Sequence, residues 1–278
     1  MTRIAIISDI HGNLPALEAV MADLEYTAPD RVIVDGDVVN RGPQSKPCLD
    51  RVREMGWLTI FGNHEEYVLK FNNGDVPAEW YSDWWLPTRH VAESELTAAD
   101  LDYFRTLPRS HVVTEPGLPA LRIVHGSPRH LNEGIGPWLD DGELLELSEG
   151  VPEPVLIGAH THRTLDRRVG SRWFLNCGAV GAPFNGNPDA QYLLLTARAG
   201  AWHAEFRSVP YDHAPLYAAW EATGYMDRSM IAQIFRLEVE TAHFHLGIYL
   251  EFCEQRGLAQ NDPRSFQQYC GTIRHATP

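Results

Sequence analysis

Short apolar runs alternate with segments of helical period along the N-terminal part of the chain. Three runs have the length of a β-strand and end in polar residues or glycine: RIAIISD, RVIVDGD and LTIFGN. Between the first two runs, apolar residues recur at helical spacing behind a good N-cap residue: Asn13, then Leu14, Leu17, Val20, Met21 and Leu24. A second helix is predicted over residues 46–53. This order predicts a βαβαβ unit with a parallel sheet.

The middle of the chain contains further segments of both kinds. A helix is predicted through EEYVLKF after His64, and TAAD at residues 97–100 reads as a capping box whose helix closes at Pro108. Five later strands follow one another with little room for helices: LRIVHG, PVLIGAH, RWFLNCG, QYLLLTA and WHAEFRSV. They predict a second, mainly antiparallel or mixed sheet packed on the first, and hence an α/β (α+β) fold.

Aromatic and apolar residues elsewhere in the chain fit packing roles. We expect Trp80, Trp84 and Trp85, which lie at helical spacing, to pack in the core and not to stack on nucleic-acid bases. From residue 212 the chain is predicted to form C-terminal helices, with no proline-rich or glycine-rich linker before them. One helix has an apolar stripe that could cover a cleft, mediate self-association as a homo-oligomer or pack on the core: Ile231, Ile234, Phe235 and Leu237.

Composition and charge narrow the functions that such a fold could serve. The 278 residues are 44% hydrophobic, as in ordinary globular proteins, and no apolar run is long enough to span a membrane. No separate apolar segment precedes the first strand, and the four cysteines form no CxxC pair. We therefore expect a cytoplasmic protein with reduced thiols and no membrane contact. The formal net charge of -14 argues against duplex nucleic acid as a partner and leaves small anions open.

Residues that can bind metals follow the apolar strands. In SDIHGN, Asp9 and His11 lie two residues apart at the end of the first strand, where alternating residues would point to the same side. Seven such residues would converge on one edge of the sheets: Asp9, His11, Asp37, Asn63, His125, His160 and His162. Nitrogen and oxygen ligands without thiolate favour Mn, Fe or Zn over Ca, and less decisively over Mg.

The motifs that contain these residues resemble those of the calcineurin-like metallophosphoesterases. The series SDIHGN, DGDVVNRGP, FGNHEE, VHGSP and GAHTH is similar to the five motifs of that family in type and order, and the resemblance covers roughly residues 3–240. SDIHGNLPALEAV and VPYD resemble the small bacterial members. The resemblance implies a four-layer αββα sandwich of two mixed sheets flanked by helices. The change in the character of the chain near residue 212 divides it into a metallophosphoesterase domain at residues 1–211 and a C-terminal helical appendage, packed on the same domain, at residues 212–278.

A binuclear metal centre is a second implication of the resemblance. One metal ion would be held by Asp9, His11, Asp37 and His162, and the other by Asp37, Asn63, His125 and His160. Asp37 would bridge two divalent ions about 3.5–4 Å apart, with Mn as the expected metal and Fe, Zn or Mg as alternatives. A hydroxide that bridges the ions would then attack phosphorus in line with the leaving group.

The resemblance also suggests roles for residues beside the ligands. His64 would be the catalytic residue that donates a proton to the departing oxygen, and Glu65 could orient it. Arg41 in NRGP would contact the substrate phosphate, and the alternative is an arginine paired with a surface carboxylate. Asn40 and Arg129 are weaker candidates for phosphate binding.

The sequence departs at two places from the motifs of proteins that it resembles. Serine/threonine phosphatases need an arginine just before the GNHE motif, and the presence of Phe61 there argues against a protein phosphatase. In NCGAVGAPFNG, Cys177, Ala179 and Phe184 replace a proline, a serine and an arginine of the small bacterial members. We still expect a glycine-rich turn beside the metals, without a nucleophilic role for Cys177.

These observations predict a metal-dependent hydrolase of small or nucleotide-like phosphate esters. A phosphodiester is slightly favoured, because a monoester dianion rewards extra cationic contacts and only Arg41 stands out as one. The alternatives within the same chemistry are a phosphomonoesterase or nucleotidase and a dinucleoside polyphosphate hydrolase, because RGP also resembles the second motif of those hydrolases. A catalytically silent scaffold protein on the same fold is the alternative from another class.

Overall fold

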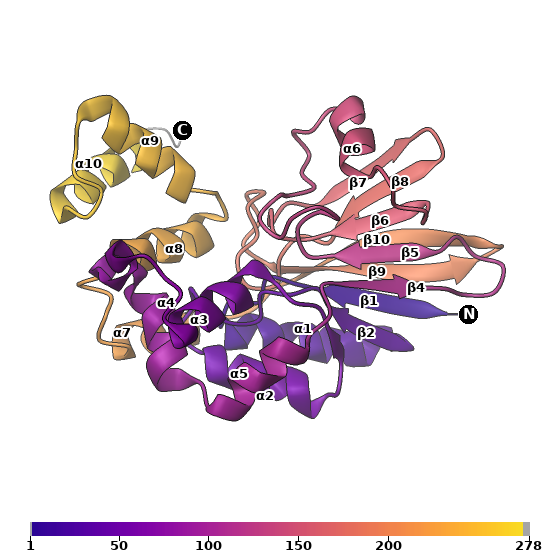
Figure 1. The fold of residues 1–278 in the computed structure, drawn as a ribbon, viewed down its shortest axis with the longest axis horizontal. Helices are drawn as coiled ribbons and strands as arrows, with labels where there is room; N and C mark the ends of the chain where they lie inside the picture. The colour runs from indigo at the N-terminus through magenta and orange to yellow at the C-terminus, as the bar shows by residue number, and fades with distance from the viewer. Residues whose placement is uncertain (1, 275–278) are drawn as a thin grey trace.

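The computed structural model describes residues 2–274 and contains two five-stranded β-sheets (Figure 1). Residue 1 and residues 275–278, which our domain boundaries include, lie outside the described residues. The first sheet has the order β10-β9-β1-β2-β3. Its strands are β1 (Arg3–Ile7), β2 (Arg31–Val34), β3 (Leu58–Thr59), β9 (Ala190–Arg198) and β10 (Ala201–Val209). The parallel pairing of β1, β2 and β3 confirms the predicted βαβαβ unit.

The second sheet has the order β4-β5-β6-β8-β7. Its strands are β4 (Ser110–Val113), β5 (Leu121–Val124), β6 (Val155–Gly158), β7 (Leu165–Val169) and β8 (Arg172–Asn176). The three inner strands β5, β6 and β8 are parallel to one another, whereas the edge strands β4 and β7 are antiparallel to their neighbours. Both sheets are therefore mixed.

The last two predicted strands do not belong to the second sheet, so that part of the prediction is wrong. QYLLLTA and WHAEFRSV form β9 and β10, which extend the first sheet in antiparallel fashion. Residues 190–196 of β9 are all buried, and a continuous apolar run of this kind suits an inner strand beside β1. The prediction also missed β4, β7 and the short helix α6 (Asp141–Leu147), whose sequences SHVV, LDRRV and DGELLEL are short or polar.

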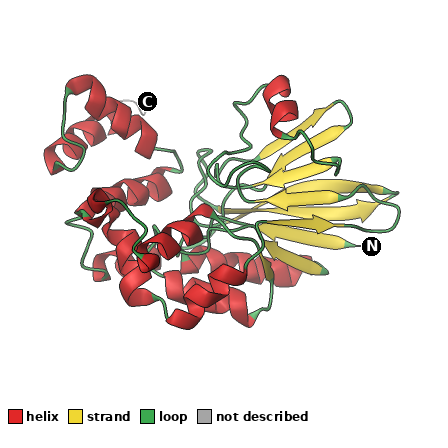
Figure 2. Cartoon of the chain, viewed as in Figure 1, coloured by secondary structure: helices red, strands yellow, loops and turns green. Residues whose placement is uncertain are grey.

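The two sheets and their helices form the four layers that we expected. Alternation along β1 sends Ala5 and Ile7 toward the helices, while Ile4 and Ile6 face the second sheet. The helices on the first sheet are α1 (Leu14–Thr27), α2 (Ser45–Glu54), α3 (Asn63–Asn73) and α5 (Ala98–Thr106). On the far side, α6 covers the second sheet through Leu144 and Leu147. The strands lie together on one side of the molecule, and most helices lie on the other (Figure 2).

The helix caps follow from the sequence. The Asn13 side chain accepts a hydrogen bond from the backbone N–H of Ala16 at the start of α1, as predicted. Thr97 and Asp100 form the predicted capping box of α5. Between α3 and α5, short helical turns lead into α4 (Leu86–His90), and the rings of Trp80 and Trp85 stack 3.8 Å apart there. Both rings pack against the core on the first sheet, which is the packing role expected for them.

Four C-terminal helices follow the sheets: α7 (Ala214–Ala222), α8 (Met230–Thr241), α9 (Leu246–Arg256) and α10 (Pro263–Arg274). The chain turns between α8 and α9 at Ala242, which has a φ of 53°, so His243 and His245 lie outside both helices. Figure 1 shows α8, α9 and α10 beyond the loops in which the strands end. The domain boundary at residues 211–212 stays a prediction. None of the helices within residues 2–274 has both the length and the apolar character needed to cross a bilayer.

A glycine-rich turn, residues 178–182, packs directly against the end of β1. The backbone N–H of Val180 donates to Ser8 O, and that of Gly181 donates to Asp9 O, both at 2.9 Å. A Cβ atom on Gly181 would lie 2.0 Å from the carbonyl oxygen of Ile10, so no side chain fits there. This close approach fixes the segment that contains Asp9 and His11.

We predict opposite effects for the same substitution at two glycines. Gly181→Ala should lower the free energy of unfolding by about 1–3 kcal/mol, because the added methyl group forces two backbone segments apart. Gly271→Ala, in α10 with no atom within 4 Å of the new Cβ, should leave it unchanged or raise it by about 0.5–1 kcal/mol. Urea unfolding measures both, and equal midpoints for the two variants would contradict the close approach at Gly181.

Candidate metal centre

All seven predicted ligands lie where strands or loops reach the same edge of the two sheets. They are Asp9 and His11 after β1, Asp37 after β2, Asn63 at the start of α3, His125 after β5, and His160 and His162 after β6. All seven are buried except the half-buried His160. The parallel strands of both sheets end at this edge, so side chains from distant parts of the sequence meet there.

Five of these residues adopt the left-handed backbone conformation that is uncommon for residues other than glycine. The φ angles are 51° for Asp9, 49° for His11, 53° for Asp37, 61° for His160 and 57° for His162. β1 ends at Ile7, so Asp9 and His11 lie beyond the strand. The left-handed turns direct both side chains to one site, and the strand alternation that we assumed from the sequence is not the cause. Such conformations cost on the order of 1–3 kcal/mol each and concentrate at functional sites.

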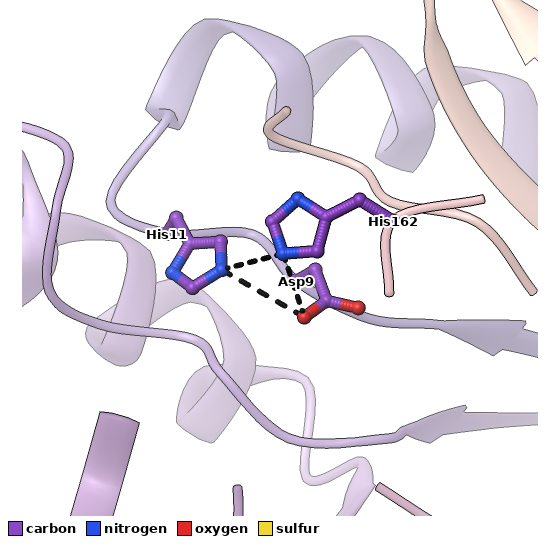
Figure 3. Close-up of side chains that lie close together, drawn as sticks. All are labelled: Asp9, His11 and His162. Atoms are coloured by element: carbon purple, nitrogen blue, oxygen red, sulfur yellow. Dashed lines mark hydrogen bonds and ion pairs between the residues drawn. The ribbon is translucent and has the colours of Figure 1, made fainter. Parts of the chain in front are cut away.

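Asp9, His11 and His162 form a first cluster, in which all three side chains point toward one another (Figure 3). Asp9 Oδ1 lies 3.7 Å from His11 Nε2 and 3.3 Å from His162 Nε2. The two histidine Nε2 atoms are 3.1 Å apart. Three ligand atoms at these separations can face one cation.

Asp37, Asn63, His125 and His160 form a second cluster. Asn63 Oδ1 lies 2.9 Å from both His125 Nε2 and His160 Nδ1. Asp37 Oδ2 lies 3.2 Å from His125 Nε2 and 3.7 Å from His11 Nε2 of the first cluster. One carboxylate oxygen therefore faces both clusters, which is the position that a bridging ligand occupies.

The two clusters contain the two sets of residues that the resemblance implies. The structure brings all seven together with their nitrogen and oxygen atoms facing one another. Their role as metal ligands stays a prediction.

Burial sets the protonation of two of the ligand imidazoles, His11 and His160. Desolvation lowers the pKa of His11 well below its ordinary value and lowers that of His160 to about 4, so both rings are neutral at pH 7. Burial would also lower the pKa of His125, but the Asp37 carboxylate overcomes this effect and raises it. The same interaction lowers the pKa of Asp37 against its own desolvation. A cation between them would replace the proton of His125.

The hydrogen bonds of the cluster fit a divalent cation. Asp9 Oδ1 is a buried oxygen without a hydrogen-bond partner, which is costly unless a cation satisfies it. His125 Nδ1 lies 2.7 Å from Asp35 O, and His162 Nδ1 lies 2.6 Å from Ala182 O. A ring that donates from Nδ1 to a carbonyl keeps the Nε2 lone pair free for a metal. The donor set of imidazole, carboxylate and amide oxygen suits Mn, Fe or Zn.

Glu65 does not orient His64, contrary to our expectation. Its carboxylate is fully buried and accepts hydrogen bonds from the backbone N–H groups of Asp37, Val38 and Gly62, each at 2.9 Å. Burial, followed by the charge of Asp37, raises the pKa of Glu65 to about 7. Glu65 therefore fastens the loop after β2 to the start of α3 and holds Asp37 in its left-handed turn.

Asn40 is the residue that contacts His64. Its Nδ2 lies 2.8 Å from His64 Nδ1, while its Oδ1 accepts hydrogen bonds from the Arg41 N–H and the Thr88 hydroxyl at 2.7 and 3.2 Å. These two donors fix the orientation of the amide, so Asn40 donates to Nδ1 of His64. Burial lowers the pKa of His64, and the neutral ring therefore has its proton on Nε2.

Arg41 is not paired with a surface carboxylate. Its Nη1 lies 3.4 Å from Oε2 of Glu238 on α8, a side chain with an exposed fraction of 1%. The guanidinium also lies 5.2 Å from the ring centroid of Phe235 on the same helix. Arg41 lines two cavities beside His160 and His162, so it faces the candidate metal centre as well as its carboxylate partner.

The other residues singled out in the sequence have different surroundings. Arg129 pairs with Glu133 and Glu146 near a cavity that contains none of the predicted ligands, which does not fit phosphate binding at this centre. Phe184 stacks on the His162 ring at 4.4 Å. Cys177 is buried, and desolvation raises the pKa of its thiol, as expected for a structural cysteine.

Sequence reasoning missed the contribution of α8 to this site. Glu238 connects Arg41 to the turn between α8 and α9, because its Oε1 accepts the backbone N–H groups of His245 and Leu246 at 2.8 Å. Phe235 contacts the His11 ring at 5.6 Å. An acidic residue three positions after Phe235 and four after Ile234, on a face that the sequence marks as apolar, was the signal that pointed to a buried partner.

Comparisons with known proteins agree with the geometry. The sequence profile of the family described as calcineurin-like phosphoesterase matches residues 2–164. The E. coli K12 phosphodiesterase YfcE is 26% identical over 203 residues, which are 70% of this chain and 88% of YfcE. Uncharacterized protein MJ0912 of Methanocaldococcus jannaschii is 27% identical over 78% of this chain and 90% of its own. The symmetrical bis(5'-nucleosyl)-tetraphosphatase of Dechloromonas aromatica is 30% identical over 39% of this chain and 40% of its own length.

A solved structure extends the similarity to most of the fold. The metallophosphoesterase from Sphaerobacter thermophilus has a TM-score of 0.69 and 25% identity, and the match covers 87% of this chain and 99% of that one. The two chains therefore share their fold over the matched region. With the family profile matched across more than half of its length, the chain belongs to the calcineurin-like phosphoesterase family and is a hydrolase of phosphate esters.

Proposed function

We propose that this protein hydrolyses a phosphodiester of a small or nucleotide-like molecule with two divalent metal ions, Mn being the expected metal. The observation that supports this most strongly is the single Asp37 oxygen that faces both clusters of nitrogen and oxygen atoms. A phosphomonoesterase and a dinucleoside polyphosphate hydrolase are the alternatives, and they share the same centre.

The clusters define which residues would hold the metal ions. Asp9, His11, Asp37 and His162 would bind one ion, and Asp37, Asn63, His125 and His160 the other. Two bound divalent ions would neutralise the phosphate oxygens and lower the pKa of water, so that hydroxide is available as the nucleophile near neutral pH. Glu65 contributes indirectly, because its hydrogen bonds hold the Asp37 loop and the Asn63 loop together.

His64 would donate its Nε2 proton in a hydrogen bond to the leaving oxygen. Asn40 holds the ring in this tautomer through Nδ1, and the N–H stabilises the negative charge that develops as the bond between phosphorus and that oxygen breaks. In the overall reaction one water is consumed. Its oxygen stays on phosphorus, and one of its protons ends on the leaving group.

Arg41 would contact a nonbridging phosphate oxygen. Its guanidinium lines the cavity next to His64, and Glu238 and Phe235 hold it there. Because part of its charge is already matched by Glu238, a phosphodiester monoanion suits the site better than a monoester dianion. This supports the preference for a diester.

Metal removal and one isosteric substitution test the two-metal proposal. Protein treated with a chelator should lose hydrolysis of bis-p-nitrophenyl phosphate, and added Mn²⁺ should restore it with two ions bound per chain. Asp37→Asn keeps Oδ1, which accepts the backbone N–H of His64 at 2.8 Å, but replaces Oδ2 with an amide NH₂ that cannot bind a cation. Its turnover should fall by roughly 10³-fold or more, since the site loses its bridging charge.

Asp102→Asn provides the control, because its side chain is exposed. This variant should behave like the wild type in turnover and in metal content measured by mass spectrometry. An Asp37→Asn protein that binds two ions and keeps full turnover would rule out the shared-carboxylate centre.

The role of His64 is tested with leaving groups of different basicity. His64→Ala should bind metal normally and lose about 10²-fold or more in kcat for a phenyl ester, because the basic phenolate depends on a proton donor. The loss should be smaller for a p-nitrophenyl ester, whose leaving group is stable as an anion. His203→Ala, at an exposed site on β10, is the control. Equal losses with both esters would exclude His64 as the leaving-group donor.

The role of Arg41 is tested by a change that keeps its charge. Arg41→Lys loses the planar fork, so we expect KM for a diester and the inhibition constant of inorganic phosphate to rise about tenfold, since one bidentate contact is lost. Arg228→Lys, an exposed arginine paired with Asp83, should change neither. If Arg41→Lys lowers only thermal stability and leaves both constants unchanged, Arg41 is solely the partner of Glu238.

A further inference from the structure

Two cavities adjoin the candidate metal centre, and Arg41 lines both of them. The first, of about 260 Å³, is lined by His64 and is called the His64 cavity below. The second, of about 370 Å³, is lined by Trp138 and is called the Trp138 cavity. Both are also lined by Arg41, His160 and His162, so a phosphorus atom bound at the metals would be adjacent to both spaces.

The His64 cavity has one polar wall and one apolar wall. Asp37 and Asn63 contribute to the polar wall. The apolar wall comes from the C-terminal helices and the segment before α4: Ile231 of α8, Leu250 of α9, and Trp84 and Trp85. A leaving oxygen within hydrogen-bond reach of His64 would direct its organic group into this apolar space.

The Trp138 cavity has a different character and lacks His64. Trp138 is 57% exposed, and its ring contacts the backbone of Gly136 and the guanidinium of Arg163. A Cβ atom on Gly136 would lie 2.4 Å from the ring, so only glycine lets the ring lie against the backbone. The ring also contacts the guanidinium of Arg163, which lies 5.5 Å from the ring centroid. Arg163 is itself fixed to the backbone, because its Nε donates to Phe184 O at 3.1 Å. An exposed indole that packs beside an arginine is suited to stack on a flat polar ring.

We propose that these cavities bind the two organic substituents of a phosphodiester, with the apolar leaving group in the His64 cavity and a retained nucleoside-like substituent in the Trp138 cavity. This inference rests on the proposed function, and it adds the direction in which the substrate lies. The product that keeps phosphate would then be a monoester of the substituent that stacks on Trp138.

Two diesters with the same leaving group test the Trp138 cavity. Methyl p-nitrophenyl phosphate has almost no retained substituent, whereas the p-nitrophenyl ester of thymidine 5'-phosphate has a base that can stack. With Mn²⁺, Trp138→Ala should lower kcat/KM about tenfold more for the thymidine ester than for the methyl ester, as loss of one base-stacking contact predicts. Tyr26→Ala, which removes an exposed ring on α1, should leave the ratio unchanged.

A narrowed cavity tests the other half of the proposal. Leu250→Trp should lower kcat/KM for methyl 4-methylumbelliferyl phosphate at least tenfold more than for methyl p-nitrophenyl phosphate, because the bicyclic leaving group needs more space. Ile248→Trp is the matched control on the same helix, since Ile248 is 53% exposed and does not line the cavity.

The outcomes separate this inference from the proposed function. A structural defect would lower kcat/KM for all esters alike, so the ratio of kcat/KM between the paired esters would stay as in the wild type. Unchanged ratios in both Trp138→Ala and Leu250→Trp would overturn the assignment of the cavities. A wild-type protein that hydrolyses none of the diesters with any metal would overturn the proposed function itself, and the assignment with it.

Discussion

The buried carboxylate of Asp37 is the group on which the site depends. It lies between two sets of side chains that come from both sheets, and burial would raise its pKa if His125 did not hold it ionised. The Glu65 carboxylate keeps the Asp37 loop in place, because it accepts two backbone N–H groups of that loop and one from Gly62 at the start of α3. A negative charge is therefore fixed at the meeting point of the sheets, where it is stable only with a positive partner.

The backbone around this charge adopts strained, left-handed conformations. Left-handed turns at five of the seven predicted ligands, and glycines that allow contacts such as that of Gly181 with Ile10, bring donor atoms within a few ångströms of one another. The four layers of packed strands and helices supply the stability that offsets these conformations. The ligand atoms are consequently positioned before any ion binds, which lowers the cost of assembling the centre.

Strand-length apolar runs that end in Asp, Asn or His were sufficient to predict this edge of the fold and the residues that meet there. The sequence could not show where β9 would pair, because a buried run fits either sheet and only packing beside β1 decides. It also could not separate the roles of Asn40 and Glu65. Both lie beside motif residues, and the choice depends on the orientation of one amide and on three backbone N–H groups.

The family profile matches residues 2–164, which include all seven predicted ligands and His64. Part of the lining of the cavities beside this centre lies after that region: Phe184, Ile231, Leu246 and Leu250. The predicted ligands therefore lie in one part of the chain, whereas the cavities are completed by residues from a second part. Relatives that share the metal-binding motifs but differ in their C-terminal helices would perform the same hydrolysis on different esters, because α8 and α9 shape the space next to His64 and hold Arg41 beside it.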